Sequence, residues 1–148
     1  MSVTSTGVGI GTAIARAHLD IEGPTRLGSY HEIASNVVSS SGVVTLDLKN
    51  RQSFLLTTTE NITRFDITGL AANSTTAFTV KILQGGTPRT VAINNFNNID
   101  TGSPVTVQYP GGVVPTVTNV AAKTDIYSFM TFDGGTTLYG VIGGQNFS

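Results

Sequence analysis

The residues best suited to acid–base or metal chemistry lie near the start of the chain. His18 and His31 are thirteen residues apart, and carboxylates lie beside them at Asp20, Glu22 and Glu32. Imidazole and carboxylate groups bind zinc, but this spacing matches no zinc signature. The chain has no cysteine, which excludes thiolate metal sites and disulfides. We therefore expect polar surface or interface groups here, and no metal site.

A glycine run, GVGIGTAIA, covers residues 7–15 and superficially resembles a dinucleotide-binding loop. It has no strand pattern before it, and its glycines do not follow the G-x-G-x-x-G spacing. The glycines fit better in a segment that lies close against a neighbouring backbone, because they carry no side chain. We expect no nucleotide and no other cofactor.

Four aspartates, Asp66, Asp100, Asp125 and Asp133, could form a calcium site or a glycosidase pair. A glycosidase needs two carboxylates at a defined separation in a cleft. These four are isolated in sequence, and each falls at a strand edge or turn, where aspartate is favoured. No G-x-S-x-G motif is present. The sequence predicts a protein that is not an enzyme, with calcium binding as a minor alternative.

The composition points away from charged partners. Charged residues make up 11% of the 148 residues, and the net charge is −1, against about 25% charged residues in an average protein. A protein that follows a nucleic-acid backbone needs a basic stripe, which is missing. No run of apolar residues is long enough to span a membrane. A surface of short neutral polar groups suits a chain that works within an assembly.

Alternating apolar and polar residues dominate from Gly42 onward. In GVVTLDLK, Val44, Leu46 and Leu48 share one face, and STTAFTVKILQ repeats the pattern with Thr76, Phe78, Val80 and Ile82. About eight such strands follow one another, with no helix between them. This favours an all-β, antiparallel, jelly-roll-like sandwich over residues 41–148. Parallel α/β folds are excluded because crossover helices are missing.

Residues 1–40 follow neither period for long and are expected to form an arm. The arm should be extended, with one short helix over Thr12–Leu19, since Gly23-Pro24 would break any longer helix. The candidate anchoring residues of this arm are Ile10, Ile14, His18, Leu19 and Tyr30.

The segment TDIYSFMTFDGGTTLYGVIGG, residues 124–144, reads as two strands around an Asp-Gly-Gly turn. Both faces of its first strand carry large apolar groups, yet one face of a two-layer sandwich is wet. We therefore expect a subunit contact here. The candidate interface residues are Tyr127, Phe129, Phe132 and Tyr139.

Residues 42–147 resemble a β-module found in structural proteins of tailed bacteriophages. The resemblance rests on VTLDL, FLLTTTENIT and FTVKILQGG, on the return RTVAI, on QYPGG, and on the closing TDIYSFMTFDGGTTLYGVIGGQNF. It implies a virion location and no bond-making chemistry.

The short arm and compact β-domain are similar in layout to capsid decoration proteins, which implies a homotrimer bound to the major capsid protein or another virion protein. The alternative is a short tail fibre, a fibre adaptor or a baseplate-associated protein. Such a protein would use the Asn-rich segment Asn94–Ser103, whose asparagines and aromatic ring could contact host sugars.

Overall fold

The computed structural model describes residues 1–3, 7–15, 17–72 and 74–148, and these form two compact units. The first unit is Met1–His31 and the second is Glu32–Ser148. Over the described residues no helix is long and apolar enough to cross a membrane. The boundary between the units lies nine residues before the end of the arm expected over residues 1–40, because residues 35–37 and 39–40 already pair with strands of the large sheet.

The first unit contains a small sheet in the order β1–β2–β3. Its strands are β1 (Ser2–Val3), β2 (Val8–Ile10) and β3 (Leu19–Ile21). β2 pairs with β1 in the antiparallel sense and with β3 in the parallel sense. The glycine run does lie close against a backbone, since a Cβ added at Gly7 would overlap the carbonyl oxygen of Ala17.

The short helix expected over Thr12–Leu19 is not formed by the described residues of that range, which make bends and the start of β3; Arg16 lies outside the description. A helix of two turns with weak propensity is unstable, because its few hydrogen bonds do not offset the free-energy cost of forming the first turn. Instead the Val8 N–H donates to the His18 carbonyl (2.9 Å), and the Glu22 N–H donates to that of Ile10 (2.9 Å).

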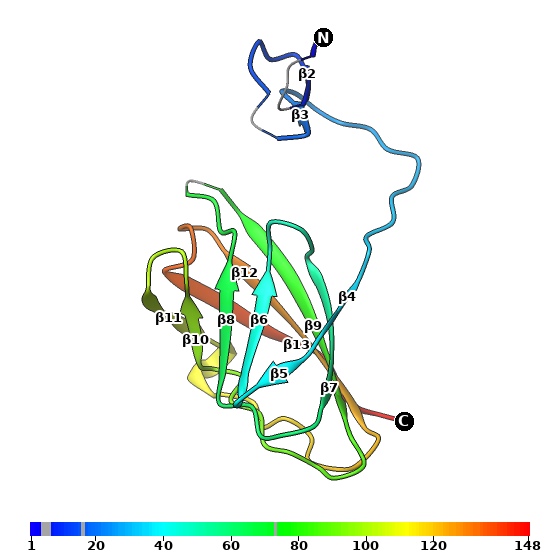
Figure 1. The fold of residues 1–148 in the computed structure, drawn as a ribbon, viewed down its shortest axis with the longest axis vertical. Coiled ribbons are helices and arrows are strands. Elements are labelled where there is room, and N and C mark those ends of the chain that lie inside the picture. Colours follow the sequence, from blue (N-terminus) through cyan, green and yellow to red (C-terminus); the bar gives the residue numbers. More distant parts are fainter. Residues whose placement is uncertain (4–6, 16, 73) are drawn as a thin grey trace. The chain divides into compact units, whose positions relative to one another are not determined.

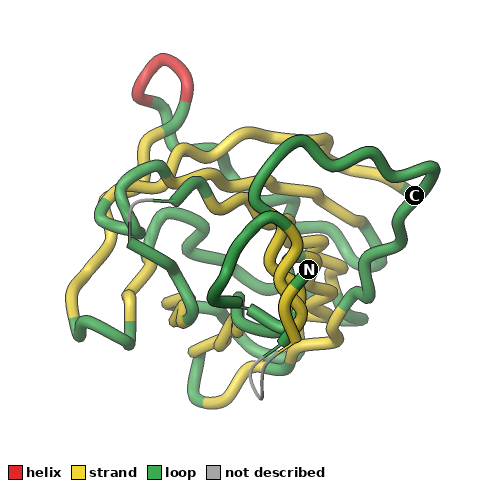
Figure 2. The backbone as a smooth tube through the Cα atoms, turned by 90° about the horizontal axis from the view of Figure 1, so that it is seen from above, coloured by secondary structure: helices red, strands yellow, loops and turns green. Residues whose placement is uncertain are grey.

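The second unit is all-β, as expected, and forms a sandwich that is nearly a closed barrel (Figure 1). Its strands are β4 (Ser35–Val37), β5 (Ser39–Ser40), β6 (Val43–Asp47), β7 (Ser53–Thr58), β8 (Arg64–Thr68), β9 (Thr76–Gln84), β10 (Phe96–Asn98), β11 (Ser103–Gln108), β12 (Thr124–Thr131) and β13 (Thr137–Phe147). Their order across the sheet is β4-β7-β9-β12-β13-β11-β10-β8-β6-β5. Figure 2 shows one short 3-10 turn, Pro110–Gly112, among these strands and their loops.

The pairing is mixed, so the expected antiparallel arrangement is wrong for much of the sheet. β4, β7 and β9 are parallel neighbours in one layer, and β6, β8 and β10 are parallel neighbours in the other. Consecutive strands from β6 to β10 alternate between the layers. A strand of the opposite layer therefore makes the crossover that usually needs a helix. The jelly-roll order, which depends on antiparallel strands, is not confirmed.

Two features nearly close the sheet on itself. β11 pairs with both β10 and β13 and so joins the layers on one side. The two strands at the ends of the order, β4 and β5, are separated in sequence only by Val38. Because closure removes unpaired sheet edges, it limits unwanted strand pairing.

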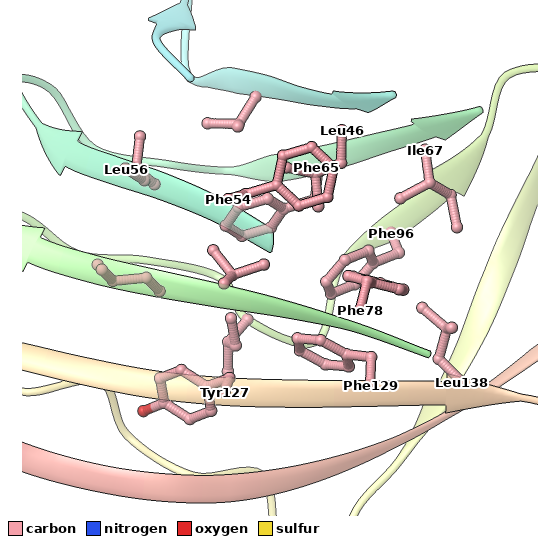
Figure 3. Packing of buried hydrophobic residues seen from close by; sticks show 14 of the residues in the cluster. Leu46, Phe54, Leu56, Phe65, Ile67, Phe78, Phe96, Tyr127, Phe129 and Leu138 are labelled. Carbon is pink, nitrogen blue, oxygen red and sulfur yellow. The ribbon is translucent and has the colours of Figure 1, made fainter. Parts of the chain in front are cut away.

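The core lies between the two layers and is rich in aromatic rings (Figure 3). Phe65 stacks on Phe96 with ring centroids 5.1 Å apart, and Phe78 stacks on Phe129 at 5.2 Å. Phe96 also contacts Phe129 at 4.9 Å. These contacts join β8, β9, β10 and β12 across the sandwich, so the core holds both layers together.

Candidate interaction surface

The four aspartates considered for calcium or catalysis do not converge. Asp125 is buried, and its oxygens accept the backbone N–H groups of Thr118 (2.7 Å) and Asn146 (2.9 Å). Burial alone would raise the pKa of Asp125, but these hydrogen bonds outweigh it and lower the pKa below its usual value. The Tyr127 hydroxyl donates to the same carboxylate (3.2 Å). Asp125 therefore ties the loop at Thr118 and the end of β13 to β12.

Asp133 closes the turn between β12 and β13. Its Oδ1 accepts the backbone N–H groups of Thr136 (3.0 Å) and Thr137 (3.0 Å) and the hydroxyl of Thr131 (2.9 Å). The amide hydrogen bond from Thr137 is the largest cause that lowers the pKa of Asp133, which falls to about 2. This carboxylate is a turn-forming group, as the Asp-Gly-Gly sequence predicts.

The other two aspartates are also engaged locally. Asp100 accepts the Gly69 N–H (2.6 Å) and the Thr68 hydroxyl (2.7 Å), and these bonds lower its pKa. Asp66 holds the guanidinium of Arg64 through two hydrogen bonds of 2.7 and 3.1 Å. No group of three or more metal-binding side chains is found among the described residues.

Three hollows lined by described residues bring no pair of carboxylates together. One of about 270 Å³ lies at the seam of the barrel and is lined by residues of β4, β6 and β7 together with Asn50 and Arg51. Its carboxylate, Asp47, already accepts hydrogen bonds from the Asn50 side chain (2.6 Å) and the Lys49 N–H (3.0 Å). This hollow therefore contains a single carboxylate, which is engaged in local hydrogen bonds, and has no pair of carboxylates among its lining residues.

The Asn-rich segment Asn94–Ser103 is less available than expected for contact with sugars. Residues 96–98 form β10, and the side chains of Phe96 and Asn98 are buried. The aromatic ring expected at a sugar-binding surface is thus part of the core, because Phe96 points toward the opposite layer and contacts Phe78 and Phe129.

The interface prediction is wrong for Tyr127 and Phe129. Their relative exposures are 0% and 1%, and both side chains project from β12 into the core (Figure 3). Phe132 and Tyr139, by contrast, are exposed at 59% and 46%, and their rings meet edge to face at 6.0 Å. The alternation along β12 therefore sends the odd-numbered side chains inward and leaves the even-numbered ones on the outer face.

The outer face of β12 and β13, together with Phe132 just after β12, carries several large apolar side chains, which we name the outer stripe. It consists of Ile126, Met130, Phe132, Tyr139, Val141 and Phe147. The register places Met130 opposite Tyr139, and Ser128 opposite Val141. Phe147 covers Gly144, where a Cβ would overlap its ring. The stripe therefore follows the whole strand pair, with an aromatic ring at each end.

The surroundings of the outer stripe are polar but almost uncharged. Along β9, the outward-facing neighbours of β12 are Ala77, Thr79, Lys81 and Leu83. Lys81 is the one charged residue facing outward from β9, β12 and β13, all of which the structure describes. A sheet face with this composition is typical of a surface that another protein covers.

The predicted anchoring residues all lie on the surface of the first unit. Ile10, Ile14, Leu19 and Tyr30 are exposed, as is His18. Among the described residues of this unit, Ala15 is the buried hydrophobic one. The expected contact residues are therefore accessible to a partner, although they form no cluster that could perform chemistry. Scans against family models, curated proteins and solved structures find no match for this chain.

Proposed function

We propose that this protein is a structural component of a tailed-phage virion, and specifically a capsid decoration protein. The first unit would anchor it to the major capsid protein, and the β-sandwich would lie on the outside of the shell. The observation that carries the proposal is the exposure of Ile10, Ile14, Leu19 and Tyr30 on a small unit separate from the sandwich. We choose the major capsid protein as the partner because residues 42–147 resemble a β-module of tailed-phage structural proteins.

The size of the first unit supports an anchoring role. Chains below about 40 residues rarely hold a stable core by themselves. This unit covers 31 residues, and most of its described large apolar side chains lie on its surface. Covering those side chains on a shell would supply the apolar burial that the unit lacks.

The action proposed for the bound protein is stabilisation by mass action. A protein that binds only the assembled shell lowers the free energy of that state by RT ln(1 + [L]/Kd) for each site. No bond-making step is required, and the aspartates described above are all engaged in holding turns and loops. An alternative position on the tail would use the same fold with a different partner.

The test is to delete residues 1–31 and measure binding to purified shells. We expect the remaining chain to stay folded, because its core lies entirely within residues 44–138, and to lose binding. Ile99→Glu, an exposed apolar position in the sandwich, is the control and should bind normally. Normal decoration by the truncated chain, or labelling confined to tails when virions are imaged, would reject the proposal.

A further inference from the structure

We propose that the hollow at the seam of the barrel, which we name the seam hollow, binds one ring of a neutral sugar. Its lining includes Val37, Thr45, Asp47, Asn50, Arg51 and Phe54. The inference goes beyond the proposed function and does not depend on it, since the lining residues all belong to the second unit.

The seam hollow lies where the two layers of the sandwich meet. Val37 comes from β4 and Asp47 from β6, so its two sides belong to different layers (Figure 1). β4 and β6 are not neighbours in the sheet order, so the seam leaves space that a hydrogen-bonded strand pair would fill. The volume of the hollow is about 270 Å³. Sites for drug-sized ligands measure about 300–1,000 Å³, so this hollow has room for one small ring.

The first support is a pair of opposite charges that do not neutralise each other. Asp47 and Arg51 both line the hollow, and within the described part of the chain neither forms an ion pair. Asp47 would repel an anionic ligand and Arg51 a cationic one. A sugar hydroxyl is both a donor and an acceptor, so it can donate to the carboxylate or accept from the guanidinium. The two charges together therefore favour a neutral ligand with several hydroxyl groups.

The second support is that these groups are already held in place by the turn after β6. The Asp47 carbonyl oxygen accepts the N–H groups of Asn50 (3.3 Å) and Arg51 (3.2 Å). The Asn50 side chain donates to Asp47 Oδ2 (2.6 Å), and Arg51 Nη1 donates to the Asn50 carbonyl oxygen (2.6 Å). A carboxylate oxygen can accept a second hydrogen bond, and a guanidinium has further N–H donors. Groups fixed in this way lose less freedom when a ligand binds.

The third support is the mixture of neutral polar and apolar atoms around the two charges. The hollow is also lined by the hydroxyl-bearing residues Ser35 and Thr45, and by the apolar residues Val37 and Phe54. A sugar ring has hydroxyl groups at its rim and C–H groups on its faces, and ligand sites combine apolar walls with a few placed polar groups in this way. A free amino acid would match the two charges but would leave the hydroxyl groups without a partner. A sugar therefore fits more of the lining.

Titration of the full chain, followed by NMR, tests the site. The probes are the methyl glycosides of glucose, galactose, mannose and N-acetylglucosamine, together with L-alanine and inorganic phosphate. At least one glycoside should shift the amide signals of Asn50 and Arg51 in a saturable way, with a dissociation constant on the order of 1 mM. Alanine and phosphate should leave these signals in place at the same concentrations.

Two variants test the assignment of the lining. Arg51→Met should raise the dissociation constant about tenfold or more, because it removes charged hydrogen-bond donors. Arg64→Met is the matched control, since it removes a guanidinium that is bonded to Asp66 on β8, outside the hollow, and it should leave the affinity unchanged. Thr45→Val exchanges a hydroxyl for a methyl group at an exposed strand position. It should weaken binding severalfold, and it tests the site even if Arg51→Met disturbs the turn.

Three outcomes would overturn the inference. One is the lack of saturable shifts with all of the glycosides. Another is a stronger response to alanine or phosphate than to any glycoside, which would make the hollow a site for a charged ligand. The last is unchanged affinity in both Arg51→Met and Thr45→Val. None of these outcomes affects the shell-binding test, which depends on residues 1–31, so the two proposals can fail separately.

Discussion

At the scale of single residues, a buried glutamine joins three segments of the sandwich. The Gln84 Oε1 accepts the Thr58 hydroxyl (2.8 Å) and the Arg89 N–H (2.9 Å). Its Nε2 donates to the carbonyl oxygens of Arg89 (3.0 Å) and Thr118 (2.8 Å). These four bonds use the full hydrogen-bonding capacity of the amide. The side chain thus holds the end of β9 to β7 and to two loops.

Replacing Gln84 by leucine should strongly destabilise the fold. The substitution keeps a similar volume but leaves the backbone groups of Arg89 and Thr118 without their partner in a buried site. Each unsatisfied buried polar group costs about 1–3 kcal/mol, so we expect a loss of about 2–4 kcal/mol in the free energy of unfolding. Urea denaturation measures it. Gln108→Leu, at an exposed position on β11, is the control, and equal losses in the two variants would contradict this role for Gln84.

At the scale of the secondary-structure elements, the face of each strand that is buried could be predicted from the sequence. Val44, Leu46 and Leu48 were expected on one face, and all three are buried, as are Phe78 and Val80 on β9. The period-2 pattern carries this information because turning its apolar residues toward water would raise the free energy of the folded state.

The neighbours of each strand could not be predicted in the same way. The pattern on β7 is the same whether β7 pairs with β6 or, as it does, with β4 and β9. Pairing depends on where the connecting loops place each strand, and the alternation of residues carries no signal for this. Parallel pairing without helices was therefore missed.

The candidate interface shows the same limit. The sequence places Tyr127, Phe129, Phe132 and Tyr139 in one candidate interface, although the alternation of β12 separates the first two from Phe132. The sequence shows that Tyr127 and Phe129 share a face, but both faces of β12 are apolar. Only the position of the opposite layer, with Phe78 and Phe96 against Phe129, decides which face is inside.

Because of the turn between β12 and β13, the free energy of unfolding should decrease as the pH falls into the acid range. The pKa of Asp133 is lowered from 3.8 to about 2 in the folded protein. Its stabilising contribution is therefore fully present above about pH 4 and is lost as the pH falls toward 2. Asp133→Asn keeps an oxygen for the amide N–H groups but removes the titrating proton. We expect the loss of stability between pH 4 and pH 2 to be smaller in this variant than in the natural protein.

Thermal unfolding at a series of pH values measures this effect. Asp66→Asn is the control, since it makes the same change in charge on β8 and leaves the turn intact. The control should keep the steeper acid profile of the natural protein. If Asp133→Asn and Asp66→Asn have the same profile between pH 4 and pH 2, the proton bound by Asp133 is not linked to folding.

At the scale of the whole molecule, the core and the proposed anchoring residues belong to different parts of the chain. The core of the second unit lies within residues 44–138 and includes no residue of the first. Residues 22–34, which run across the boundary between the two units, are all exposed, and none of them belongs to a helix or strand. The sandwich can thus fold without the first unit, and the first unit can take its order from a partner.

This division predicts the site of limited proteolysis. Proteases cut exposed, extended segments before ordered ones, and Arg26 lies within residues 22–34. Brief digestion with trypsin should therefore produce a resistant fragment of residues 27–148, identified by its intact mass, while the basic residues within the sandwich stay uncut. Arg26→Gln should remove this early cleavage. The fragment should unfold with a free energy within about 0.5 kcal/mol of the full chain, because no core contact is lost. A large drop in its unfolding free energy would mean instead that residues 1–26 support the sandwich directly, and the first unit could then not be treated as an independent anchor.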